Sequence, residues 1–465
     1  MKTNIRSVLI LLAFLCLPAA GPQAQAVVPP PDGGYPGFTT AEGQKALFSL
    51  TTGSANTAVG WFSLFSNAEG SFNTATGAGA LLFNTADANT AFGAAALLFN
   101  STGINNAAVG AAALSNNTIG EENTATGAFA LSGNTEGDFN TANGAFALWV
   151  NTTGERNTAT GDSAMFSNTT GSRNTATGNA ALGQNTTGHD NTAMGSGALA
   201  TNSVASSNTA IGSGALANNT SSNNTATGFG ALFNNASGPS NTAYGFSALF
   251  NDSTGGFNTA FGFNALLNNT TGAENIALGD GAGLNVTTAS NVICIGAGVQ
   301  GENVNNSCYI GQIFNATAAA GIGVFINSNG KLGTSTSSRR FKEEIKPMDK
   351  ASEALFALKP VTFRYKKDID PAGTSQFGLV AEEVERVNPD LVARDKEHKP
   401  YSVRYDQVNA MLLNEFLKEH TTVQEQGAMI ARQQKAIEAL TAGLQKVSAQ
   451  LEVGKPAPHT VLNDQ

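Results

Sequence analysis

A short unit recurs through the middle of this chain at an almost fixed spacing. It reads N-T-A-x-G-x-x-A-L, as in the segment that begins at Asn123. Of the 14 intervals between the asparagines that open successive copies, 11 are 17 residues long and three are 16. These asparagines are Asn56, Asn73, Asn89, Asn106, Asn123, Asn140, Asn157, Asn174, Asn191, Asn208, Asn224, Asn241, Asn258, Asn275 and Asn291. A period near 17 is too short for helix pairs and fits one turn of a parallel β-solenoid.

The fixed positions of the unit indicate how such coils stack. Alanines at the third and eighth positions suit a narrow interior, and the glycine at the fifth position, from Gly60 to Gly279, suits a positive φ or a close backbone approach. The opening asparagine suits either a left-handed corner or a ladder between coils. One coil cannot bury its own apolar side, so we expect stacked coils over residues 39–297, each with two short strands.

A disordered, low-complexity tract is the alternative for this region. Across the whole chain only 13% of the residues are charged, where an ordinary globular domain has about 25%. Leucine, however, fills the ninth position in 12 of the 14 full copies. Disorder does not require a leucine and a glycine to stay in phase over so many periods, so the pattern favours a solenoid.

The repeats resemble the left-handed parallel β-roll heads of trimeric autotransporter adhesins, over residues 39–297. The resemblance implies a homotrimer of parallel rolls with an adhesive or display role; the surface ligand, such as a host or cell-surface glycan, is left unspecified. We interpret the large apolar residues after the leucine as the seam between chains, because a monomer should not expose them. Packing inside each roll is the alternative. The seam residues are Phe65, Leu82, Phe83, Leu98, Phe99, Phe166, Phe233, Phe250 and Leu267.

The first 26 residues have the order of a secretory signal peptide. Lys2 and Arg6 flank an apolar run, and the small-residue site Ala24-Gln25-Ala26 follows. The run is too short to span a bilayer, and no later stretch reaches the roughly 18 apolar residues that a spanning helix needs. We therefore expect an exported chain, secreted or at the cell surface, with no membrane span after cleavage and an extended linker over 27–38.

Charge and cysteine content limit the remaining partners. The formal net charge is -9 with few basic clusters, which makes nucleic acid an unsuitable partner. The four histidines and the cysteines show no paired metal-ligand spacing, so we expect no metal site and no cofactor. Export permits a disulfide between Cys294 and Cys308, and two buried free thiols near strand ends are the alternative.

Composition changes in the C-terminal part. Residues 337–465 contain 19 basic and 19 acidic residues, as in an ordinary globular segment, and a β-rich connector over 298–336 precedes them. Turn and proline signals bound the elements that we expect there. These elements are strands near 308–310 and 323–327, a helix over 350–358, a strand over 361–365 and a helix from about Ala381 that stops before Pro389.

Several motifs of this segment resemble the self-cleaving intramolecular chaperone domain at the C-terminus of phage endosialidases and other tail-fibre proteins. They are SSRRFK at 337–342, LKPVTF at 358–363, GLVAEEV at 378–384, PDLV at 389–392 and Tyr405. The resemblance implies that a domain over 337–412 directs trimer assembly and then cuts itself off. It places the nucleophile at Ser337, the base at Lys342 and the scissile bond at Thr336–Ser337, and it favours a structural role for Arg340.

Two departures from the family pattern bear on this chemistry. Ser338 stands where the family usually has aspartate, and Glu382, next to Glu383, stands where it usually has glutamine. A serine nucleophile needs a base, and a lysine serves only if burial brings its pKa from about 10.4 towards 7–8. A trimer interface would supply that burial. Two interpretations remain open: a serine peptidase that makes one intramolecular cut, and a structural fibre whose terminal domain only trimerises because Ser338 disables the pair.

The last part of the chain has a heptad pattern over 413–452, followed by a tail over 453–465 that we expect to be flexible. The pattern predicts a trimeric coiled coil, with a single helix packed on its own domain as the alternative. The a positions are Phe416, Val423, Ile430, Ile437, Leu444 and Leu451. In total the sequence predicts a mainly β protein: a parallel β-roll of ~17-residue coils, a small α+β chaperone domain and a coiled coil.

Overall fold

The computed structural model describes residues 37–453, so the predicted signal peptide, nearly all of the linker and the tail after Val453 lie outside the described residues. The chain divides after Ala316 into two compact units, each with its own internal contacts. Within the described range, no helix combines the length and the apolarity that crossing a membrane requires.

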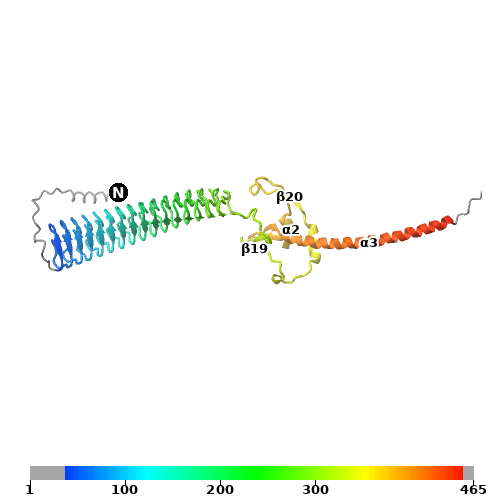
Figure 1. Ribbon diagram of the computed structural model, residues 1–465, viewed down its shortest axis with the longest axis horizontal. Helices are drawn as coiled ribbons and strands as arrows, with labels where there is room; N and C mark the ends of the chain where they lie inside the picture. Colours follow the sequence, from blue (N-terminus) through cyan, green and yellow to red (C-terminus); the bar gives the residue numbers. More distant parts are fainter. Residues whose placement is uncertain (1–36, 454–465) are drawn as a thin grey trace, which may run out of the picture. The chain divides into compact units, whose positions relative to one another are not determined.

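The first unit is a parallel β-solenoid whose strands form one 17-stranded sheet (Figure 1). Each strand lies in register on the strand of the next coil, as Ala58 does on Ala75. The sheet includes β17, so the solenoid extends beyond the limit at residue 297 that the repeats suggested. The strands are β1 (Thr40–Glu42), β2 (Thr57–Val59), β3 (Thr74–Thr76), β4 (Thr90–Phe92), β5 (Ala107–Val109), β6 (Thr124–Thr126), β7 (Thr141–Asn143), β8 (Thr158–Thr160), β9 (Thr175–Thr177), β10 (Thr192–Met194), β11 (Thr209–Ile211), β12 (Thr225–Thr227), β13 (Thr242–Tyr244), β14 (Thr259–Phe261), β15 (Ile276–Leu278), β16 (Val292–Ile295) and β17 (Ser307–Ile310).

Each coil carries one strand and not the two that we expected. The second limb is built of turns, because residues at the seventh and ninth positions adopt left-handed backbone angles, with φ of 59° at Phe129 and 51° at Leu131. Such residues interrupt an extended strand. The limb is still hydrogen-bonded between coils, since the Leu131 amide donates to the Ala147 carbonyl over 2.9 Å.

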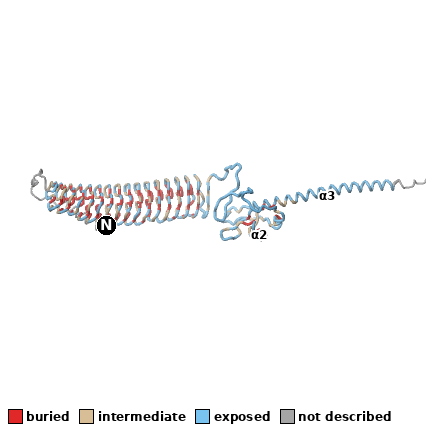
Figure 2. Tube along the Cα trace, turned by 90° about the horizontal axis from the view of Figure 1, so that it is seen from below, coloured by how far each residue is buried: buried red, intermediate tan, exposed pale blue. Residues whose placement is uncertain are grey.

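The interior follows the repeat. Alanines at the third and eighth positions and the leucine at the ninth are buried along the whole stack, which gives the continuous buried stripe of Figure 2. The fifth-position glycine is confirmed as a site of both positive φ and close approach. At Gly127, φ is 131° and an added Cβ would lie 2.5 Å from the Gly144 carbonyl oxygen. Any side chain there would collide with the next coil.

The opening asparagines from Asn56 to Asn275 form a ladder and have no left-handed φ, whereas Asn291 lies in a left-handed corner with φ of 58°. The Asn73 amide N–H donates to the Asn56 side-chain oxygen over 2.9 Å, and the Asn56 side-chain nitrogen donates to the Gly70 carbonyl over 2.8 Å. A second buried ladder, which the sequence analysis did not identify, runs along the twelfth position of the unit. Its members are Asn67, Asn84, Asn100, Asn117, Asn134, Asn151, Asn168, Asn185, Asn202, Asn219, Asn235, Asp252 and Asn269.

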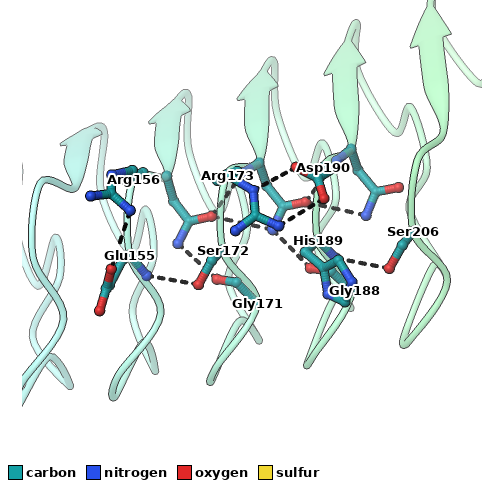
Figure 3. Close-up of polar contacts among 12 residues, drawn as sticks. Glu155, Arg156, Gly171, Ser172, Arg173, Gly188, His189, Asp190 and Ser206 are labelled. Atoms are coloured by element: carbon teal, nitrogen blue, oxygen red, sulfur yellow. Dashed lines mark hydrogen bonds and ion pairs between the residues drawn. The ribbon is translucent and has the colours of Figure 1, made fainter.

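An outer corner of the solenoid carries exposed polar contacts between coils (Figure 3). The Arg173 guanidinium donates to both carboxylate oxygens of Asp190, over 2.7 and 2.9 Å. This hydrogen bond lowers the pKa of Asp190. Next to it, the His189 amide donates to the Ser206 hydroxyl over 3.1 Å. Because these groups are exposed to water, their contacts contribute far less to the stability of the solenoid than the buried ladders do.

The two cysteines among the described residues are free thiols with different surroundings. Cys294 is buried, whereas Cys308 is exposed. In the register of β16 and β17, Cys294 lies opposite Tyr309 and Cys308 lies opposite Ile293. Successive residues of a strand point to opposite faces, so the two side chains lie on different faces of the sheet. Neither the disulfide nor the expectation of two buried thiols holds.

The second unit contains three small antiparallel hairpins, short helices and one long helix. Its core consists of Val384, Leu391, Val392, Val403, Val408 and Met411. The strand near 308–310 belongs to the solenoid, and the helix expected over 350–358 is the 3-10 helix η2; the other expected elements form close to their predicted places. The elements are β18 (Val324–Ile326), β19 (Leu332–Thr334), η1 (Arg339–Phe341), η2 (Asp349–Ala357), β20 (Val361–Phe363), β21 (Gln376–Gly378), α2 (Ala381–Val387), η3 (Pro389–Leu391), β22 (Val392–Arg394), β23 (Pro400–Val403) and α3 (Tyr405–Val453).

Helix α3 packs on this core only at its beginning. Val408 and Met411 are buried, whereas the residues from Glu419 to Leu451 are exposed, including every predicted a position in that range. The helix therefore does not lie along its own domain, which removes the alternative to a coiled coil. Partner helices are not part of the single chain, so the trimeric coiled coil stays a prediction.

Candidate cleavage site and chaperone domain

The residues predicted to carry the cleavage chemistry lie on one short stretch after β19. Ser338 has an extended backbone, and η1 then makes a single turn in which the Phe341 amide donates to the Ser338 carbonyl over 3.0 Å. This turn brings the Lys342 side chain back towards Ser337. The Lys342 ammonium donates to the Ser337 hydroxyl oxygen over 3.3 Å.

The surroundings of this pair are open to water. All residues from Thr336 to Lys342 are exposed. A lysine works as a general base only where desolvation favours its neutral form, and the single chain does not supply that desolvation. The structure therefore brings the two predicted catalytic side chains into contact without the environment that their chemistry requires.

Of the other predicted residues, Arg340 lies in η1 next to the pair, whereas Glu382 and Glu383 lie on α2. Arg340 stacks its guanidinium on the ring of Phe341, 4.6 Å from the ring centre, and both are exposed. Glu382 and Glu383 lie in the first turn of α2, where negative charge suits the helix N-terminus. Among residues 37–453, no hydrogen bond or ion pair joins the side chain of Glu382 or Glu383 to Ser337 or Lys342.

A polar cluster that the sequence analysis missed joins η2 to α3. Ser352 is fully buried, and its hydroxyl accepts a hydrogen bond from the Asn414 side chain over 2.7 Å and donates to the Glu415 carboxylate. The Lys418 ammonium donates to that carboxylate over 2.7 Å and to the Asp349 carbonyl over 2.7 Å. Hydrogen bonds from Lys418 and then Ser352 lower the pKa of Glu415. No local motif signals this cluster, because its two halves, at 349–352 and 414–418, are more than 60 residues apart in the sequence.

A cavity of about 740 Å³ lies in the same unit, with η3, β22 and the β22–β23 turn among its walls. Its lining mixes Arg394, Lys396 and Arg404 with Asp390 and Asp395. Arg394 is already paired with Glu385. The described part of the chain contains no group of three or more His, Cys, Asp or Glu side chains that would hold a metal ion.

The fold defines a class of protein: a long parallel β-solenoid followed by a small domain of short helices and hairpins. Residues 337–393 match the family model described as the chaperone of endosialidase. The match begins at Ser337 and ends within β22, and it confirms the resemblance that the motifs of this segment indicated. No curated protein matches the chain.

Proposed function

We propose that this chain is an exported, trimeric fibre or adhesin-like protein whose C-terminal domain directs its assembly and then cuts itself off at Thr336–Ser337. The observation that carries the proposal is the chaperone match, which begins at the proposed first residue of the released fragment and follows the solenoid and the β18–β19 hairpin in the chain. The solenoid is the lasting body of the fibre, and the domain over 337–412 is its assembly device.

The repeat itself explains why such a body needs an assembly device. Successive strands of the solenoid are nearly identical, so the same Thr-Ala pair faces its copy from Thr74-Ala75 to Thr259-Ala260 with one Ala-Ala exception. Chains with such a repeated surface can pair one coil out of phase with little loss of contact. A domain that trimerises first fixes the register before the solenoids associate.

The exposed helix supports the trimer. From Val423 to Leu451 the apolar a positions of α3 are more than half exposed, which a helix in water does not tolerate at such regular spacing without partners. Three such helices would bury these positions against one another. The same assembly supplies the burial that Ser337 and Lys342 lack in the single chain.

The outer surface of the solenoid suggests where chains meet. Phe233 and Phe250, two of the predicted seam residues, stack at 5.1 Å and are only partly exposed, so coil stacking already covers much of them. The columns on either side of the fifth-position glycine are more open. In these columns Tyr244 stacks on Phe261 at 4.7 Å and Phe246 on Phe263 at 5.3 Å, each about half exposed. We therefore extend the proposed seam to these two columns.

A fibre that trimerises without cutting is the second candidate. The observations that favour it are Ser338 in place of the usual aspartate and the exposure of the Ser337–Lys342 pair. Intact mass and light scattering of the purified full-length product separate the two. Cleavage gives a solenoid trimer that ends at Thr336 and a separate fragment that starts at Ser337; the non-cleaving fibre gives a trimer of uncut chains. A monomer of either length contradicts both.

A further inference from the structure

The inner asparagine ladder contains one acidic residue. Ten successive links, from Asn84 to Asn235, join the side-chain nitrogen of one rung to the side-chain oxygen of the preceding rung over 2.7–3.3 Å. The next rung is Asp252, which is fully buried. The coil from 241 to 257 therefore carries a carboxyl group at a place where the other rungs carry a neutral amide.

An asparagine in this column makes two donations that an ionised aspartate cannot make. Asn151, for example, donates to the Asn134 side-chain oxygen over 2.7 Å and to the Gly154 carbonyl over 2.9 Å. On the rung before Asp252, the Asn235 side-chain oxygen receives no such donation from the next rung and accepts from the Gly238 amide over 3.0 Å. A protonated carboxyl has one O–H donor, so protonation restores one of the two missing donations.

The surroundings of Asp252 hold no compensating charge. Its two oxygens accept from the Asn269 side chain over 2.8 Å and the Asn241 side chain over 3.3 Å. The groups that face it from its own coil and from both neighbouring coils are amides and backbone; within residues 37–453, no charged or titratable side chain contacts it. A buried carboxylate held only by neutral donors is costly in its ionised form.

We propose that Asp252 is a proton-binding site inside the solenoid, and that its protonated carboxyl completes the ladder by donating towards Asn235 or the Gly255 carbonyl. Burial raises the pKa of this group to about 7, against the opposing hydrogen bonds from Asn269 and Gly255. The folded coil thus holds a proton that the unfolded chain, with an aspartate pKa of about 3.9, releases. Proton binding by Asp252 therefore adds to the free energy of unfolding as the pH falls through about 7, and this contribution is lost above that pH.

Hydrogen exchange of the full-length protein tests the site. We compare wild type with Asp252→Asn at pH 5.5 and 8.5, corrected for the intrinsic pH dependence of exchange. Wild type should lose about tenfold or more of the protection of peptides over 241–269 on going to pH 8.5, since one unit of pKa corresponds to a factor of ten. Asp252→Asn should lose none, and peptides over 124–200 should not change in either protein. Equal losses in both proteins, or no loss in wild type, overturn the proposal.

A control variant and an infrared measurement separate the protonation of Asp252 from a general folding defect. Asp162→Asn changes an exposed carboxylate and should behave as wild type. Infrared difference spectra of wild type against Asp252→Asn at pH 5.5 should show one protonated carboxyl band that is absent at pH 8.5. A spectrum with only ionised carboxylate at pH 5.5 contradicts the site even if the exchange data are ambiguous.

Discussion

The Lys342 ammonium lies 3.3 Å from the Ser337 hydroxyl oxygen, and both side chains are exposed. Five residues and one helical turn are enough to set this contact, so it belongs to the isolated chain. Desolvation has to come from elsewhere. Under the proposed function, cleavage would wait for assembly, and the C-terminal domain would stay attached until the solenoids are aligned.

Removal of either member of the pair should leave the chain uncut. Ser337→Ala removes the proposed nucleophile and Lys342→Met the proposed base, so each should yield only the full-length product, whereas wild type should yield a fragment that starts at Ser337. Intact mass spectrometry measures this. Lys346→Met, which alters another exposed lysine nearby, is the matched control and should be processed normally. Cleavage of both dyad variants at the wild-type rate contradicts the assignment.

Restoring the aspartate of the family pattern should accelerate cleavage. Ser338 precedes η1 with an extended backbone and makes no side-chain cap, so Ser338→Asp fits without a rearrangement of the chain. Under the cleaving interpretation we expect the uncut fraction to disappear faster, and under the non-cleaving interpretation we expect cleavage to appear. The time course of denaturing gels measures both. An unchanged time course would show that this position does not limit the reaction.

The repeat predicted the solenoid well because every coil obeys the same steric rules. The alanine columns, the leucine column and the glycine at positions such as Gly127 follow directly from period and side-chain size. The number of strands per coil was wrong, because the left-handed backbone at Phe129 and Leu131 is unusual for these residue types. The side chains of these residues do not indicate a left-handed backbone, and only contacts with the stacked coils make that conformation favourable.

The polar clusters were harder to predict, because they depend on contacts between distant residues. Ser352 and Glu415 meet only when η2 lies on α3, and no local pattern relates them. The inner ladder could be seen in the sequence, because asparagine recurs three residues after the leucine. Whether these asparagines are buried or exposed depends on which face of the coil points inward, and the repeat alone does not settle that. In the proposed trimer, partner chains would set the environment of Ser337 and Lys342, and one sequence does not reveal those chains.

A substitution at the fifth-position glycine should destabilise the solenoid. Gly127→Ala places a methyl group 2.5 Å from the Gly144 carbonyl oxygen at a φ of 131°. We expect a loss of about 1–3 kcal/mol in the free energy of unfolding from backbone strain, with the collision in addition. Gly197→Ala is the control, because φ is 65° and no atom lies within 4 Å of the added group. Thermal unfolding should show a clearly larger loss for Gly127→Ala; equal losses would argue against a tight approach between coils.

Polar substitutions in the exposed aromatic column that precedes the fifth-position glycine should weaken association without unfolding the solenoid. Tyr244→Ser with Phe261→Ser removes one stacked pair that is about half exposed. Light scattering should show a lower trimer fraction, while the circular dichroism of the β-sheet stays close to wild type. Thr141→Ser with Thr158→Ser changes residues of the same sheet face in other coils and serves as the control. A trimer fraction equal to that of wild type would place the seam elsewhere.

The cluster at Ser352 should make the attachment of α3 sensitive to acid. Ser352→Ala removes one hydrogen bond from Glu415, which keeps its bond from Lys418, and one from Asn414, which keeps its bond to the Asp349 carbonyl, so we expect a modest loss in the free energy of unfolding. The pKa of Glu415 is lowered in the folded state, so its contribution is present above the pKa of an unfolded glutamate, about 4.3, and is lost as the pH falls below it. The pH dependence is opposite to that of Asp252, whose contribution to stability increases as the pH falls. Exchange of peptides over 349–357 should therefore speed up at pH 3.5 in wild type but change less in Ser352→Ala, and a larger change in the variant would contradict this role for Glu415.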